Sequence, residues 1–370
     1  MTKITLASPK FDESTFSEVV NILKSGNLVQ GDKVSSFEKK ICEYTGAKFA
    51  VAVNSATSGL FASLISAGIK PGDEVILPAL SYIATANVIE MIGAVPVFCD
   101  INCDNYNINP SLLEECLTNR TKAVIGVHEF GEPFKCSTIA DFCLTNDLVL
   151  IEDAACALGS QFQGKHIGTY GLAGVFSFHP RKSITCGDGG VVITNSELMC
   201  QKIRSFRNHG LENYGGINAG FQSVGLNLRL TEIQAAMLNM QLPALNGFLK
   251  KKFDHVNLYD EFLTNSLIKP KINTPGHSWQ SYHVLCDTNT ERDNLINILA
   301  KENIFVSLGA QCMPSEPYYS NKYGFDQKKF EFAYRANKCG LVLPIHEHLT
   351  KKDVRKVISV INEVYEDDKR

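Results

Sequence analysis

The chain has 370 residues, of which 44% are hydrophobic, 20% charged and 9% aromatic. At roughly 150 residues per domain, this length predicts two or three domains. The apolar content excludes a disordered chain. A formal net charge of -3 gives no overall field that would attract nucleic acid or an anionic membrane surface. We therefore expect no nucleic-acid partner and no membrane partner.

The first residues and the cysteines bear on where the protein works. The amino-terminal segment lacks the apolar core of a signal peptide. The most apolar long stretch, residues 75–89, is too short and too polar to span a bilayer. The twelve cysteines are scattered without a C-x-x-C pair. This pattern predicts buried, reduced thiols in a cytoplasmic protein and argues against disulfides or a zinc site.

The first two-thirds of the chain alternate between helical patterns and short apolar runs. Two helices come first, one capped by Ser14 and ended by Gly26, and one over residues 34–44 that stops at Gly46. Buried strands are then predicted at residues 49–53, 75–77, 95–98, 123–127 and 148–151, with helices between them at 58–67, 82–92, 111–117 and 139–144. Two further runs, 175–178 and 191–194, predict a hairpin. The alternation predicts an α/β fold with a mostly parallel sheet and helices on both faces.

The pattern changes after Glu232. A long helical stretch over residues 233–263, broken by Pro243, precedes a strand at 282–286, a helix at 292–301, a strand at 304–306 and two more helices. This order predicts a smaller α+β domain. We therefore expect a large α/β domain over residues 1–245 and a small carboxyl-terminal domain over residues 246–370.

Ligands of open α/β sheets bind beyond the carboxyl ends of the strands, so the residues that follow each strand are the candidate site. The first such segment, Asn54–Gly59, carries hydroxyl groups into a helix start, where unpaired N–H groups and the helix dipole favour an anion. The same residues also suit a plain helix cap. Neither nucleotide-binding glycine fingerprint is present.

Four more segments follow later strands. Tyr82 can stack on a flat ring or pack in the core. Asp153, at the end of a buried strand, needs a cationic partner such as a ligand, or it serves a structural ion pair or a helix cap. Lys182 lies between a buried strand and a glycine-rich turn; if desolvated, its amine is a nucleophile for Schiff-base chemistry, and if solvated it has no such role. Asn227 is a candidate donor and Arg229 a candidate anion clamp.

Taken together and in this order, these segments resemble the DegT-type nucleotide-sugar aminotransferases, which are pyridoxal-phosphate (PLP) enzymes of fold type I. The resemblance extends over almost the whole chain. It is carried by GNLVQGD at 26–32, PGDEV at 71–75, KAVIGVHEFG at 122–131, EDAACALGS at 152–160, SFHPRKSITCGDGG at 177–190, RNHG at 207–210 and the stretch 225–242. It implies an aspartate-aminotransferase-like fold.

The resemblance also implies roles for single residues. Lys182 matches the lysine that forms the Schiff base with PLP. Asp153 matches the acid that pairs with the pyridinium nitrogen, so that the ring can accept electrons. The remaining matches are Ala56, Thr57 and Ser177 for the cofactor phosphate, Tyr82 for stacking on the ring, and Asn227 for a phosphate ligand donated by the neighbouring subunit. The family likeness thus implies a homodimer with a shared active site.

One position departs from the family pattern. Many members have Gln, His or Glu three residues after the acid, where this chain has Cys156, close to the cofactor ring. A catalytic thiol there lacks a neighbouring base in the sequence, so we expect a cofactor contact. Candidate sugar contacts are His179, Arg229 and Tyr318, with the segments 307–319 and 211–222.

The resemblance implies amino transfer from L-glutamate to a nucleotide-linked keto sugar, with pyridoxamine phosphate (PMP) formed between the half-reactions. The expected acceptor is a 4-keto-6-deoxyhexose, made for a lipopolysaccharide O-antigen, a capsule or an antibiotic. A 3-keto sugar is an open alternative. A PLP/PMP-dependent sugar dehydratase of the same family replaces the lysine by histidine, so Lys182 argues against it. A non-catalytic regulator on the same fold need not retain Lys182 and Asp153, and both are present.

Overall fold

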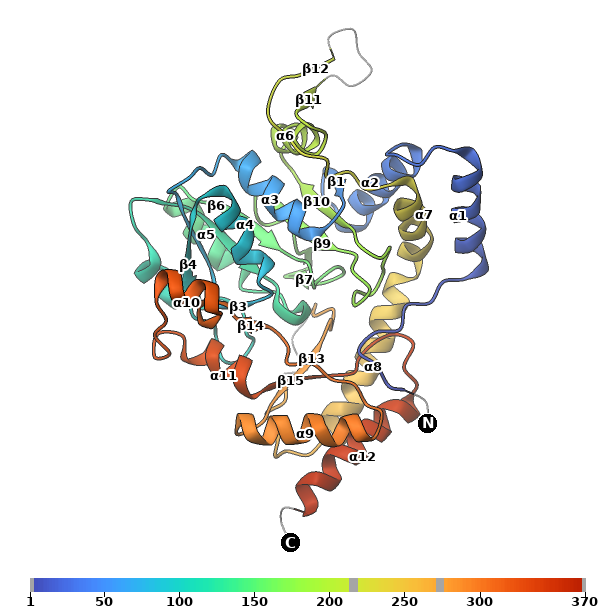
Figure 1. The fold of residues 1–370 in the computed structure, drawn as a ribbon, viewed down its shortest axis with the longest axis vertical. Helices are drawn as coiled ribbons and strands as arrows, with labels where there is room; N and C mark the ends of the chain where they lie inside the picture. The colour runs from blue at the N-terminus through green and yellow to red at the C-terminus, as the bar shows by residue number, and fades with distance from the viewer. Residues whose placement is uncertain (1–2, 213–218, 271–275, 368–370) are drawn as a thin grey trace.

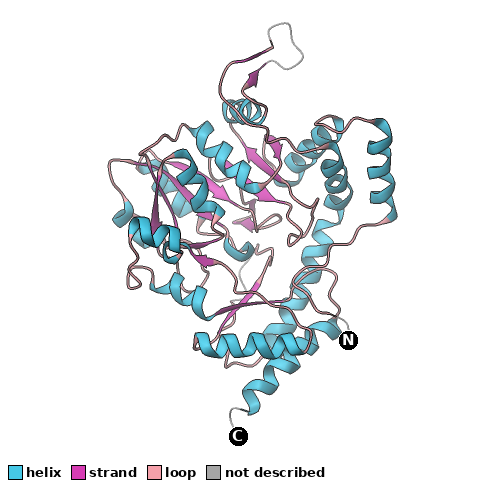
Figure 2. Ribbon diagram, viewed as in Figure 1, coloured by secondary structure: helices cyan, strands magenta, loops and turns pink. Residues whose placement is uncertain are grey.

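The computed structural model describes residues 3–212, 219–270 and 276–367. Its centre is a seven-stranded sheet with the strand order β1-β10-β9-β6-β5-β2-β4, flanked by helices (Figures 1 and 2). The strands are β1 Phe49–Val53, β2 Glu74–Pro78, β4 Val95–Cys99, β5 Thr121–Val127, β6 Val149–Asp153, β9 Ala173–Ser177 and β10 Gly190–Thr194. All seven overlap runs that the sequence predicts as strands, and the α/β fold is confirmed.

Most of the sheet is parallel, with an antiparallel edge. Strands β4, β2, β5, β6 and β9 run parallel, and β9 and β10 form the expected antiparallel pair. β1 differs from the βαβ expectation, because it pairs antiparallel with β10 along its whole length. The residue-49 strand therefore borders the hairpin at the sheet edge, which brings its carboxyl end next to the start of β10.

Helices cover both faces of the sheet, as expected. On one face, α3 (Ala56–Ala67), α4 (Ala84–Ile92) and α6 (Glu197–Arg207) contribute Leu60, Val88 and Ile203 to one apolar cluster. On the other face, α2 (Asp32–Thr45), α5 (Cys136–Thr145) and α7 (Glu232–Gln241) contribute Phe37, Ile139 and Leu238 to a second cluster. The buried faces of the helices thus hold the sheet from both sides.

Two predicted helices differ from the structure, the first in its cap and the second in its type. The first helix, α1 (Glu13–Ser25), is capped by Asp12, which accepts the Thr15 N–H; Ser14 is inside the helix and its hydroxyl donates to the same carboxylate. Gly26 ends α1 at φ 72° as predicted. The helix expected at 111–117 is a pair of short 3-10 turns, η1 (Pro110–Leu112) and η2 (Glu114–Cys116). A segment this short forms few hydrogen bonds against the cost of nucleating an α-helix, and short pieces of chain often take the 3-10 form.

A third apolar cluster lies beneath the large sheet. Strands β13 (Tyr282–Leu285) and β15 (Gly340–Leu343) pair antiparallel and pack with α8 (Leu245–Phe262), α9 (Asn289–Lys301) and α12 (Lys351–Asp367). The expected strand at 304–306 is wrong: Ile304 makes a single bridge to Ile4, and β15 pairs with β13 in its place. The domain division at residues 245 and 246 stays a prediction, and α8 begins there.

Shorter elements complete the fold. They are β3 (Leu80–Ser81) with β14 (Gln311–Cys312), β7 (Gln161–Phe162) with β8 (Lys165–His166), β11 (Leu211–Glu212) with β12 (Gly220–Phe221), the helices α10 (Pro317–Tyr323) and α11 (Glu331–Cys339), and the turns η3 (Glu129–Gly131), η4 (Leu242–Ala244) and η5 (Met313–Ser315). All twelve cysteines are free thiols. Within the described ranges, no helix has the length and apolar character to cross a membrane.

Candidate active site

A cavity of about 480 Å³ opens beyond the carboxyl ends of β5, β6 and β9, where ligands of α/β sheets bind. Its volume lies within the range of small-molecule sites. The residues that line it include Thr57, Tyr82, Asp153, Cys156, Ser177 and Lys182. Ala56 and His179 line it as well. Eight of the eleven site residues expected from the sequence therefore border one space.

Asp153 is the acid at the floor of this cavity. It is the last residue of β6 and only 5% exposed. One carboxylate oxygen accepts the Thr85 hydroxyl at 2.8 Å, and the other accepts the Ala155 N–H at 3.1 Å. Burial raises the pKa of Asp153, while these hydrogen bonds and the Lys182 ammonium act in the opposite direction. A cationic ligand in the cavity would add the partner that an ionised carboxylate needs at this depth.

Lys182 projects into the same cavity from the loop after β9. Its backbone N–H donates to the His179 carbonyl at 2.8 Å, which closes a turn. Its ammonium Nζ donates to the Cys156 sulfur at 2.9 Å. Burial raises the pKa of the Cys156 thiol, although Lys182 lowers it, so the sulfur stays protonated and acts as a weak acceptor. The amine is thus held by a neutral group at the edge of an open space.

The amino end of α3 forms another wall of the cavity. Ser55 caps this helix by accepting the Ser58 N–H at 3.1 Å, so the N–H groups of Ala56 and Thr57 remain for another acceptor. Gly190 lets β10 approach this end closely: a Cβ there would lie 2.6 Å from the Ser55 carbonyl carbon and 2.7 Å from the Ala56 nitrogen. Ser177, at the end of β9, adds a hydroxyl. These groups suit a phosphate.

PLP has an aldehyde, a ring nitrogen, a phosphate and a flat ring, and the cavity offers a group for each. Lys182 suits the aldehyde, Asp153 the nitrogen and the end of α3 the phosphate. Tyr82 lines the cavity with its side chain 68% exposed, so its ring is free to cover an aromatic ligand. The residues therefore fit the cofactor that the sequence predicts.

Three of the predicted site residues do not border the cavity. Asn227 is exposed and pairs through its backbone with Asn208, outside the cavity wall. Arg229 donates to the Asn208 side chain and does not border the cavity either. Tyr318, on α10, donates to Glu90 at 3.2 Å; it belongs to a surface cluster with α4 and is not brought to the site. Part of the segment 211–222, namely 213–218, lies outside the described residues.

Sequence reasoning missed several side chains of the cavity. Thr85 holds Asp153 from α4, Glu129 follows β5, and Gln280 reaches the Arg181 carbonyl from beyond the large sheet. The sequence offered a sign of Glu129, because this residue lies two positions after the end of a predicted strand. No sequence pattern pointed to Lys252. It is buried on α8 and supports the loop that carries Lys182 by donating to the Ser183 hydroxyl at 2.7 Å.

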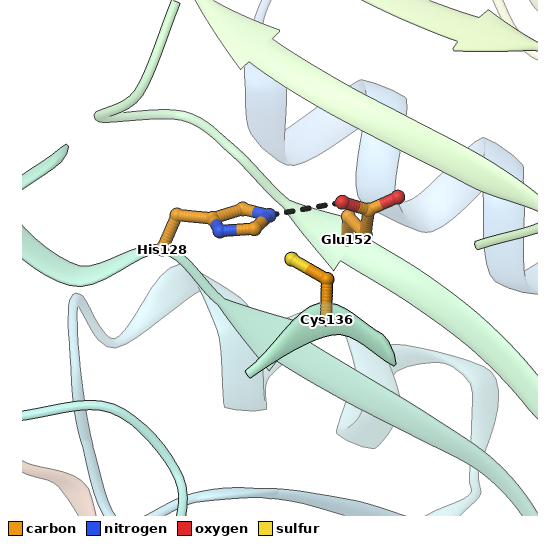
Figure 3. Close-up of side chains that lie close together, drawn as sticks. All are labelled: His128, Cys136 and Glu152. Carbon is orange, nitrogen blue, oxygen red and sulfur yellow. Dashed lines mark hydrogen bonds and ion pairs between the residues drawn. The ribbon is translucent and has the colours of Figure 1, made fainter. Parts of the chain in front are cut away.

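His128, Cys136 and Glu152 point toward one another beside the site (Figure 3). Both carboxylate oxygens of Glu152 accept backbone N–H groups at 2.7 Å. Oε2 accepts the N–H of Gly168, and Oε1 accepts those of Tyr170 and Gly171. His128 adds a contact at 3.0 Å. Burial opposes ionisation of Glu152, yet these hydrogen bonds hold its pKa below the ordinary value. The cluster anchors the strand end from which Asp153 projects.

The chain matches known aminotransferases over nearly its whole length. Residues 9–362 match the DegT/DnrJ/EryC1/StrS aminotransferase family. GDP-perosamine synthase from Escherichia coli O157:H7 is 33% identical, covering 91% of this chain and 92% of that protein. PseC from Helicobacter pylori, an aminotransferase involved in the biosynthesis of pseudoaminic acid, has a TM-score of 0.94 at 28% identity and covers 99% of this chain and 100% of its own.

A third similar protein bears on the cofactor. Spr1654 from Streptococcus pneumoniae, solved in a PLP form, has a TM-score of 0.90 at 27% identity and covers 98% of this chain and 100% of its own. The expected PLP cofactor is thereby confirmed at the level of the family. The chain belongs to the DegT/DnrJ/EryC1/StrS aminotransferase family, and it is an enzyme of the PLP-dependent sugar aminotransferase kind.

Proposed function

We propose that the protein transfers the amino group of L-glutamate to a keto sugar carried on a nucleotide, and that the acceptor is a 4-keto-6-deoxyhexose. The observation that carries the proposal is the presence of Lys182 and buried Asp153 in one cavity beside the free amino end of α3. An amine, a buried acid and an anion site are what PLP chemistry requires. The similarity to GDP-perosamine synthase supports a nucleotide sugar as the acceptor.

Bound PLP supplies an electron sink that stabilises negative charge on the carbon that bears the transferred amine. In our proposal, Asp153 would pair with the ring nitrogen and keep it protonated. The end of α3 and Ser177 would bind the phosphate, and Tyr82 would cover the ring. Lys182 would hold the cofactor at rest. Its free amine would remove the proton from the donor α-carbon and would later deliver a proton to the sugar carbon.

Cys156 acts in this proposal as a neutral support for the lysine. Its sulfur accepts the Lys182 ammonium at 2.9 Å, and burial raises the pKa of its thiol. A protonated thiol is a poor nucleophile, so covalent chemistry at this sulfur is disfavoured. We therefore retain Cys156 as a cofactor contact.

The central test compares two lysines. Lys182→Ala should lower amino transfer by about 10²–10⁴-fold or more, the usual contribution of a positioned acid–base group, while the exposed Lys122→Ala at the opposite end of β5 should leave it unchanged. PLP is added to purified protein, its absorbance is followed as L-glutamate is titrated in, and keto sugars on dTDP, UDP and GDP are then supplied as acceptors. Full activity in Lys182→Ala would overturn the mechanism.

The sugar panel also separates the alternatives. A 3-keto acceptor that turns over when 4-keto sugars do not would correct the ring position and leave the mechanism intact. Loss of a sugar hydroxyl without amino transfer would indicate the dehydratase. No absorbance change with any amino donor would favour the non-catalytic regulator.

We further propose a homodimer in which Asn227 of one subunit binds the cofactor phosphate of the other. Asn227 is exposed and lies outside the cavity wall of its own chain, which suits a residue that serves a neighbour. The test is a mixed dimer of Lys182→Ala with Asn227→Ala. If the subunits share sites, one site of the mixed dimer contains both native residues and activity reappears. If both residues act in one chain, each site keeps one defect and the mixed dimer stays inactive.

The twelve free thiols suit a reducing compartment, so we assign the reaction to the cytoplasm. The product would be an amino sugar nucleotide for a surface glycan, such as an O-antigen, or for an antibiotic. The role of PseC in pseudoaminic acid biosynthesis supports amino sugar formation as the pathway context. Deletion of the gene followed by analysis of the surface polysaccharide would test it, because an unchanged amino sugar content would rule this context out.

A further inference from the structure

Glu129 is a buried carboxyl group on the cavity wall to which the proposed mechanism gives no role. It follows β5 at the start of the short turn η3, its side chain is 5% exposed, and it borders the same space as Asp153 and Lys182. Its backbone N–H donates to the Asn107 side chain at 2.9 Å. The turn is therefore held in place, and the carboxyl group faces the site from a fixed position.

Two hydroxyl groups connect Glu129 to Asp153. The Thr85 hydroxyl donates to the Asp153 carboxylate at 2.8 Å. The Ser81 oxygen lies 3.1 Å from the Thr85 oxygen, and the Ser81 hydroxyl hydrogen-bonds with the Glu129 carboxyl group. Glu129, Ser81, Thr85 and Asp153 thus form one buried chain of hydrogen bonds along the cavity wall.

A count of protons requires that one of the two carboxyl groups in this chain be protonated. A hydroxyl group has one proton to donate. When Asp153 is ionised, its carboxylate engages the Thr85 proton, so the contact between Ser81 and Thr85 uses the Ser81 proton. The contact between Ser81 and Glu129 then needs a proton from Glu129 itself. With both carboxyl groups ionised, one of the three contacts would bring two lone pairs together without a proton.

The electrostatic surroundings favour the same state. Burial and the charge of Asp153 raise the pKa of Glu129 to about 8, although Lys182 and the hydrogen bonds with the Phe130 backbone and the Ser81 hydroxyl act against them. The Cys156 thiol, whose pKa is itself raised by burial, also interacts with the charge of Glu129. Asp153 is the better placed of the two carboxyl groups to carry the negative charge, because its carboxylate also accepts the Ala155 N–H at 3.1 Å.

We propose that Glu129 is protonated in the resting protein and acts through Ser81 and Thr85 as a positioning residue that orients the ionised Asp153 carboxylate. The pairing of Asp153 with the cofactor belongs to the proposed function. The proton on Glu129 is a property of the protein before any cofactor binds, so it can be tested separately.

The first experiment is infrared difference spectroscopy of the cofactor-free protein as the pH is raised. Wild-type protein should show the carbonyl band of a protonated carboxylic acid at pH 6, and this band should disappear with a midpoint near the pKa of about 8. Glu129→Gln should lack the band, and Asp153→Asn should keep it. A band that survives in Glu129→Gln, or one that is lost in Asp153→Asn alone, would assign the proton elsewhere and overturn the proposal.

The second experiment tests positioning by PLP affinity at pH 7. The amide of Glu129→Gln can still donate to Ser81, so its Kd should stay within about threefold of wild type. Glu129→Leu cannot donate, and loss of this hydrogen bond should raise the Kd about tenfold. Ser81→Ala breaks the next link and should have a similar effect, which covers the case of a Leu variant that fails to fold. Wild-type affinity in Ser81→Ala and a folded Glu129→Leu would refute the positioning role.

The two experiments separate this inference from the proposed function. If Asp153→Asn binds PLP as wild type does, the assignment of Asp153 to the ring nitrogen fails, whereas the infrared result for Glu129 is unaffected. If the infrared band is absent from wild type at pH 6, the proton on Glu129 fails while the roles of Lys182 and Asp153 remain.

Discussion

Gly190→Ala is a one-carbon change that tests whether the end of α3 binds the cofactor phosphate. Gly190 begins β10 and pairs with Val53 on one side and Ser177 on the other. Its φ lies outside the left-handed region, so alanine is not strained by its own backbone. The added Cβ would instead lie 2.6 Å from the Ser55 carbonyl carbon and 2.7 Å from the Ala56 nitrogen. Both of these are backbone atoms at the start of α3.

The size of the effect follows from this geometry. An ordinary contact between carbon atoms is about 3.5 Å, so the start of α3 or the start of β10 must move by about 1 Å. Overpacking of this kind costs about 1–3 kcal/mol of stability. Loss of one hydrogen bond to a charged phosphate costs about 1.5–3 kcal/mol, which is roughly a 10- to 150-fold increase in the Kd for PLP.

The assay is a titration of cofactor-free protein with PLP, followed by the absorbance of the bound cofactor, with circular dichroism and Tm to confirm folding. The matched control is Gly247→Ala on α8, where an added Cβ meets nothing within 4 Å. The control should bind PLP as wild type does and lose no stability. If a folded Gly190→Ala also binds PLP with wild-type affinity, the phosphate does not lie at the end of α3.

Three further predictions concern buried ionisable groups. Asp153→Asn should weaken PLP binding about 100-fold, since a buried cation left without its partner costs about 3 kcal/mol or more; titration against wild type measures this, and equal affinities would contradict the pairing. Glu38→Gln should destabilise the fold by about 3–5 kcal/mol, because Glu38 accepts the buried Arg207 guanidinium at 2.7 Å; urea unfolding measures the loss, and a change below about 1 kcal/mol would refute it. Burial lowers the pKa of His283 to about 3, so the unfolded chain binds a proton that the folded protein does not. Stability should therefore fall as the pH drops from about 6.5 toward 3, and less steeply in His283→Phe; parallel Tm profiles would exclude His283 as the cause.

Local patterns in the sequence were sufficient for most of the fold. Each strand of the large sheet is a short apolar run, and Gly26 and Gly46 end their helices in the left-handed conformation as expected. The candidate site was readable for the same reason. Asp153 and Lys182 directly follow or lie close after strands, and parallel strands bring their carboxyl ends to one edge.

Other features depend on contacts between distant parts of the chain. The antiparallel pairing of β1 with β10 joins residues about 140 positions apart in the register, and β13 pairs with β15 although a nearer run at 304–306 looked like a strand. Hydrophobic periodicity identifies a strand but carries no information on its neighbour. For this reason the domain boundary also remains a prediction.

The sequence by itself determined the strands, the family motifs and the paired roles expected of Lys182 and Asp153, because each depends on residues close together along the chain. Only the tertiary structure decided what surrounds them: the Cys156 sulfur on the Lys182 amine, and the hydroxyl chain from Glu129 to Asp153. These contacts join separate strands and helices, and they exist only when the buried sheet holds those elements side by side.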